Sequence, residues 1–68
     1  MTAYYVNNNA QSNGDHEVHK SGCYWLSLAS NTSYLGEFSS CFPAVAKAKL
    51  TYPTANGCGH CSPACNTG

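Results

Sequence analysis

The chain has 68 residues, which is enough for one small domain, and a domain of this size buries only about 60% of its unfolded surface. Its three lysines and three acidic residues give a formal net charge of zero, and it has no arginine. Because nucleic-acid binders draw most of their affinity from lysine and arginine on phosphates, we expect no nucleic-acid partner. No segment has the length of a membrane span or the pattern of a signal peptide, so we expect a cytoplasmic protein that does not contact a membrane.

The first third of the chain predicts a β-hairpin. Residues 3–6 are aromatic and β-branched, which favours a strand, and residues 15–19 alternate around Val18 as a second strand. A polar run that ends in Asn13-Gly14 lies between them and is typical of a turn. We therefore expect two antiparallel strands joined by a long, loose loop.

Three further elements follow. Residues 24–26 form a short apolar segment, residues 27–33 a loop, and residues 34–38 a third strand. Ser40 is the simplest N-cap of a helix that continues to about Tyr52, because Pro53 cannot extend it. Helical spacing predicts two adjoining apolar rows on that helix, Phe42/Ala46/Leu50 and Cys41/Val45/Ala48/Tyr52.

Beyond the helix, Asn56-Gly57 predicts a turn into the cysteine-rich end of the chain. The predicted fold class is α+β: a single domain over residues 1–68, with a small three-stranded antiparallel sheet, one helix and a zinc knuckle.

Five cysteines are available to staple this small core. Two short pairs, His19-x3-Cys23 and Cys58-x2-Cys61, match the two-plus-two arrangement of tetrahedral structural zinc sites. Two or three intervening residues let one tight turn aim both side chains of a pair at a single ion. The sequence therefore predicts one structural zinc ion held by His19, Cys23, Cys58 and Cys61.

Several alternatives remain open at this point. Cys65 can replace His19 as the fourth ligand, can be a thiol near a frayed tail, or can form a disulfide with Cys41. A domain stapled by disulfides without metal is a separate alternative. Cys41 can also be a small buried hydrophobe at the helix start, or a thiol activated by the helix N-terminus.

The sequence Cys58-Gly59-His60-Cys61 matches the dithiol motif of protein disulfide isomerases. A thioredoxin-type site requires the motif to open a helix in a parallel βαβ context, whereas this motif follows the predicted helix. A thiol–disulfide redox protein is accordingly the alternative function, and a non-enzymatic domain is preferred.

The order of these elements resembles the Ada-type metal-binding domain over roughly residues 15–62, and residues 15–20 and 34–38 are similar to those of short bacterial proteins of uncharacterised function. The resemblance implies zinc at His19, Cys23, Cys58 and Cys61. In the repair members of that family, the first cysteine of the first pair accepts a methyl group. His19 stands at that position here, so the resemblance does not carry the repair chemistry over to this chain.

Without a nucleophile–base arrangement or a basic patch, we expect a zinc-binding interaction module. Its partner would be a protein, and the candidate contact residues are the aromatic side chains of Tyr4, Tyr5, Tyr24 and Trp25.

Overall fold

The computed structural model of the protein describes residues 1–67. One sheet contains four strands: β1 (Thr2–Asn7), β2 (His16–Lys20), β3 (Thr32–Phe38) and β4 (Ala55–Gly57). The other elements of the described residues are three helices: α1 (Tyr24–Leu28), α2 (Cys41–Ala48) and the 3₁₀-helix η1 (Pro63–Cys65).

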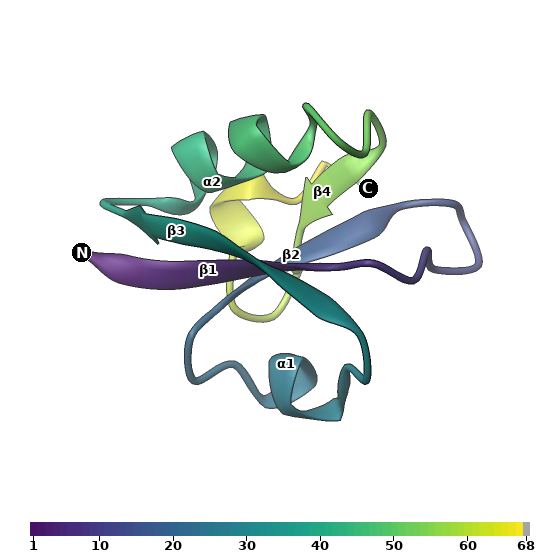
Figure 1. Ribbon diagram of the computed structural model, residues 1–68, viewed down its shortest axis with the longest axis horizontal. Helices are drawn as coiled ribbons and strands as arrows, with labels where there is room; N and C mark the ends of the chain where they lie inside the picture. Colours follow the sequence, from purple (N-terminus) through teal and green to yellow (C-terminus); the bar gives the residue numbers. More distant parts are fainter. Residues whose placement is uncertain (68) are drawn as a thin grey trace.

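The strand order across the sheet is β3-β1-β2-β4 (Figure 1). β1 pairs antiparallel with both β2 and β3, as expected for the hairpin and the third strand, whereas β4 runs parallel to β2. The predicted α+β class is therefore confirmed. The predicted three-stranded antiparallel sheet is wrong in its details, because a fourth strand makes the sheet mixed.

The fourth strand occupies residues for which the sequence predicts a turn. Asn56 and Gly57 have low intrinsic strand propensity, but local propensity yields to tertiary context. The Asn56 side chain stabilises this segment, because its Oδ1 accepts hydrogen bonds from the backbone N–H of Gly57 at 3.0 Å and of Thr67 at 3.1 Å. These contacts hold the segment beside β2, with Ala55 opposite His16 and Gly57 opposite Val18.

The hydrophobic core lies between the sheet and α2, which lies above the strands in Figure 1. Strand alternation directs Val6, Val18 and Ala55 toward α2, where they meet Ala44 and Ala48. Small alanine side chains allow the helix backbone to approach the sheet closely. A disulfide between Cys41 and Cys65 ties the start of α2 to η1 on this same side of the sheet.

Helix α2 begins after Ser40, as predicted, although the Ser40 side chain makes no capping hydrogen bond. It ends at Ala48, before the predicted end near Tyr52, and its buried side chains are Cys41, Ala44, Val45 and Ala48. The predicted row of Phe42, Ala46 and Leu50 is wrong, since Phe42 and Leu50 are 62% and 86% exposed. The disulfide at Cys41 explains this orientation, because it holds that edge of the helix against the core.

The short apolar segment at residues 24–26 is part of the helix α1, which lies below the strands in Figure 1. None of its residues is buried, and Tyr24, Trp25 and Leu28 are each about half exposed or more. The helix therefore contributes little to the core, and its position depends on the residues that flank it.

Candidate metal centre

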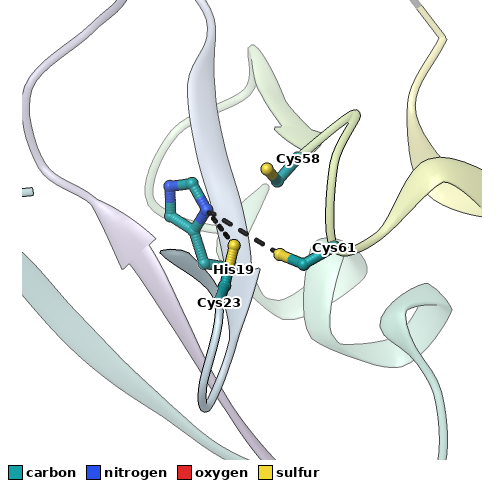
Figure 2. A group of neighbouring side chains, drawn as sticks. All are labelled: His19, Cys23, Cys58 and Cys61. Carbon is teal, nitrogen blue, oxygen red and sulfur yellow. Dashed lines mark hydrogen bonds between the residues drawn. The ribbon is translucent and has the colours of Figure 1, made fainter. Parts of the chain in front are cut away.

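The side chains of His19, Cys23, Cys58 and Cys61 come together in one cluster (Figure 2). Their ligand atoms all lie within 4.8 Å of one another. Three of the residues are buried, and Cys61 is partly exposed. The structure thus brings together the four side chains that the spacing of the two pairs predicts.

Strand alternation positions His19. It follows Val18 on β2, so the two side chains point to opposite faces, and both are almost completely buried. The imidazole Nδ1 faces the thiols, at 3.7 Å from Cys23 Sγ and 3.9 Å from Cys61 Sγ (Figure 2). The other nitrogen, Nε2, lies 3.6 Å from Glu17 Oε1. A metal-binding histidine commonly has such a partner on its outer nitrogen, which fixes the ring tautomer.

A tight turn after β2 delivers Cys23. Gly22 adopts a positive φ of 87°, which a side chain would disfavour, and the Cys23 N–H donates to the Lys20 carbonyl at 3.1 Å. Cys23 is also the N-cap residue of α1, so backbone N–H groups of the first turn of that helix face its sulfur. The turn and the helix start together aim the thiol back toward His19.

The parallel pairing of β4 with β2 delivers Cys58. Its backbone N–H donates to the Val18 carbonyl at 2.9 Å, which extends the ladder by one residue and places Cys58 next to His19. The chain then turns sharply, since the Ser62 N–H donates to the Cys58 carbonyl at 2.8 Å. The His60 N–H points to Cys58 Sγ at 3.4 Å, and the turn brings Cys61 to the outer side of the cluster.

Cys65 lies outside this cluster. It forms the disulfide with Cys41, with the two Cα atoms 6.2 Å apart, and it packs in the core on the α2 side. Of the two fourth ligands that the sequence leaves open, the geometry therefore supplies His19.

Gly57 lies between the metal cluster and the Cys41–Cys65 disulfide, and its role is not evident from the sequence. A Cβ at this position would lie 2.6 Å from Cys65 Cβ and 2.9 Å from the Ser62 carbonyl oxygen. Only glycine allows η1 to pass so close behind β4. The nearby sequence Asn56-Gly57 signals a turn, so the residue pattern hides this close approach.

The distances in the cluster fit a tetrahedral ion. Zinc binds sulfur at about 2.3 Å and nitrogen at about 2.0–2.1 Å, which makes the nitrogen–sulfur edge of a tetrahedron roughly 3.6 Å long. The two measured nitrogen–sulfur distances, 3.7 and 3.9 Å, are close to that edge. Three sulfurs and one imidazole nitrogen are also the donors that structural zinc prefers, so the residues present fit the ion.

Burial and hydrogen bonds shift the pKa values of three of the four side chains. Burial and the hydrogen bond to Cys23 raise the pKa of the Cys61 thiol to about 12. Burial also opposes ionisation of Cys23, but hydrogen bonds from Cys61 and from the backbone N–H groups of Leu26 and Trp25 outweigh it and lower the pKa of Cys23. Burial lowers the pKa of His19, against the opposing effect of the Glu17 charge, which favours the neutral imidazole that binds metal.

The other two histidines lie apart from the cluster. His16 stacks on Tyr52, with ring centroids 3.8 Å apart, and its Nδ1 lies 3.0 Å from the Asn7 carbonyl oxygen. His60 is exposed, and its ring makes an edge contact with Trp25. Among the aromatic contact candidates, Tyr24 and Trp25 are exposed beside the cluster, but Tyr4 is a core residue at 6% exposure, so its place among them is wrong.

No helix of the described residues is long and apolar enough to cross a membrane. No protein-family model, curated protein or solved structure gives a significant match to the chain.

Proposed function

We propose that this protein is a small zinc-binding domain in which His19, Cys23, Cys58 and Cys61 hold one structural zinc ion. The observation that carries the proposal is the convergence of one imidazole nitrogen and three thiols within 4.8 Å, with two nitrogen–sulfur distances close to the edge of a tetrahedral site. When bound, the ion would supply folding energy, of order 10 kcal/mol for structural sites in small peptides.

A structural role follows from the number of ligands. Catalytic zinc sites keep one coordination position open for water or substrate, whereas four protein ligands complete the tetrahedron. The four side chains here fix the end of β2, the start of α1 and the turn after β4 relative to one another. The Ada-type resemblance adds only its order of ligands to this proposal.

The domain would then act as a protein interaction module rather than an enzyme. Tyr24, Trp25 and Leu28 expose apolar surface on α1, a helix whose first residue follows the ligand Cys23. Aromatic side chains at such positions are enriched in protein interfaces. By fixing α1, the ion would present these three side chains in one arrangement.

The alternative function, a thiol–disulfide redox protein, has one supporting observation: Cys58 and Cys61 are both free thiols in a dithiol motif. Their exposure argues against it. In a thioredoxin-type dithiol the first cysteine is the accessible nucleophile, whereas Cys58 is 2% exposed here and Cys61 is the outer residue.

Native mass spectrometry of the purified chain tests the proposal. We expect one zinc ion per chain, and titration of the metal-free chain with Co²⁺ should give the visible absorption of a tetrahedral sulfur-rich site. His19→Ala should lower zinc affinity by at least about 100-fold, because it removes a direct ligand. His60→Ala is the matched control, since this exposed histidine lies in the same loop. A folded, metal-free protein that binds zinc no better than His19→Ala would refute the proposal.

A further inference from the structure

The four ligands of the candidate site are protected to different degrees. His19, Cys23 and Cys58 are 1%, 6% and 2% exposed, whereas Cys61 lies in the partly exposed class. A groove open to solvent is lined by Cys61 and Cys23, together with Lys20, Tyr24 and His60. Cys61 is the more exposed of the two cysteines, so a small oxidant in the groove reaches its sulfur first.

A metal ligand presents its sulfur as a thiolate, because a thiol loses its proton when it coordinates zinc. The thiolate is the form of cysteine that reacts with peroxides, so a zinc-bound Cys61 would be open to attack from the groove.

A second sulfur is available to complete the reaction. Cys23 Sγ lies within 4.8 Å of Cys61 Sγ, and Cys23 lines the same groove. The remaining disulfide, Cys41–Cys65, lies on the other face of the sheet and takes no part.

From this geometry we propose that Cys61 is an oxidation site for hydroperoxides, and that its oxidation forms a Cys23–Cys61 disulfide that empties the metal site. This inference rests on the proposed zinc site.

The reaction balances with one peroxide. The Cys61 thiolate attacks the peroxide, the O–O bond breaks, and Cys61 becomes a sulfenic acid as hydroxide leaves. The Cys23 thiolate then attacks the Cys61 sulfur, an S–S bond forms, and a second hydroxide leaves. Two thiolates lose two electrons and one peroxide gains them. The site keeps only His19 and Cys58, which are too few ligands to hold the ion tightly.

The test treats the zinc-loaded full-length chain with one equivalent of hydrogen peroxide, with a zinc-sensitive dye in solution. We expect one zinc ion released per peroxide consumed and a chain mass lower by two hydrogens relative to the reduced metal-free chain. Chymotrypsin cuts next to Tyr24 and Phe38, so a disulfide of Cys23 would join the peptide that ends at Tyr24 to the peptides already linked by Cys41–Cys65. Fragmentation of that product between Cys58 and Cys61 in the mass spectrometer then identifies Cys61 as the partner.

Cys61→His removes the partly exposed thiol. This variant should consume hydrogen peroxide at least about tenfold more slowly and should form no disulfide that includes Cys23 at equal peroxide dose. Three results in the unaltered chain would overturn the inference. Zinc could stay bound after peroxide treatment, or it could be released while the chain gains oxygen atoms and no disulfide. The third is a disulfide between Cys58 and either Cys23 or Cys61. A chain without zinc before treatment would instead refute the proposed function.

Discussion

At the scale of single residues, the arrangement depends on two neighbours that point in opposite directions. Val18 is 0% exposed in the core, and His19 is 1% exposed in the metal cluster. A strand of five residues thus serves two buried layers at once. The register of the strand is therefore fixed, because a slip of one residue would move Val18 to the metal cluster and His19 into the core.

Gly57 is the residue whose replacement tests this arrangement most directly. Gly57→Ala should lower the free energy of unfolding by about 2 kcal/mol or more, because the new Cβ would lie 2.6 Å from Cys65 Cβ. Urea denaturation of the zinc-loaded proteins measures the change. Gly59→Ala is the matched control, since a Cβ there would be 3.4 Å from its nearest neighbour, an atom of the Asn66 side chain. Equal stabilities of the two variants would contradict the role of Gly57.

Protonation of Cys61 gives a second residue-scale prediction. Because burial raises the pKa of this thiol to about 12 in the metal-free site, the group is protonated at neutral pH and must lose its proton when zinc binds. Binding should therefore release at least one proton from Cys61, and zinc affinity should rise with pH below about 12. Calorimetric titrations in two buffers of different ionisation enthalpy count the protons. A binding enthalpy that is the same in both buffers would mean that no proton is released, and it would show this prediction to be wrong.

At the scale of elements, α1 is the part of the fold with the weakest support of its own. It has no buried residue, and Cys23 immediately precedes it. We expect removal of zinc by a chelator to release α1 while the core between α2 and the sheet persists, because the Cys41–Cys65 disulfide remains. Trp25 is the only tryptophan and lies on α1, so its fluorescence reports on this helix alone.

The experiment follows Trp25 fluorescence and amide hydrogen exchange during chelation. Faster exchange at α1 with continued protection of β1 and α2 is the expected result. Simultaneous loss of protection in all three elements would instead mean that the ion supports the whole fold.

The elements also show where sequence reasoning succeeds and where it stops. The hairpin, the third strand and the start of α2 follow from alternation, turn residues and Ser40, which are local signals. The fourth strand does not, because Asn56-Gly57 has the pattern of a turn, and its pairing with β2 depends on contacts with Thr67 and on the position of α2. Of the two apolar rows predicted for α2, the one with Cys41, Val45 and Ala48 is buried, whereas Phe42 and Leu50 of the other are exposed, since the Cys41–Cys65 disulfide orients the helix.

The candidate site is easier to predict from the sequence than the fold, because the two ligands of a chelating pair must lie close together along the chain. His19 with Cys23 and Cys58 with Cys61 are visible as pairs in the sequence. The choice between His19 and Cys65 is not visible, because it depends on the side of the sheet that each residue faces. Glu17 beside His19 follows from strand alternation only once the histidine is known to be buried.

At the scale of the whole molecule, two staples of different chemistry hold the two faces of one sheet. The disulfide lies with the core on the α2 side, and the candidate metal site lies on the other side. Cys41→Ser combined with Cys65→Ser should lower the free energy of unfolding by about 3 kcal/mol, from the entropy of a loop with a sequence separation of 24.

Because the two staples occupy separate faces, the double variant should still give the absorption of tetrahedral Co²⁺ when it is folded. Denaturation in excess zinc measures the stability change, and the Co²⁺ spectrum measures the site. A folded double variant without that spectrum would mean that the disulfide also shapes the metal site.

The parallel pairing of β2 with β4 has a consequence for the order of assembly during synthesis. His19 and Cys23 are synthesised before Cys58 and Cys61, and they lie on the β1–β2 hairpin and the turn that follows it. Half of the 68 residues, residues 24–57, separates the two pairs of ligands, and a parallel strand cannot join the sheet until the intervening chain has crossed over it. A nascent chain therefore carries half a binding site until Cys61 has been synthesised, and it can complete the site only after β4 has joined the sheet.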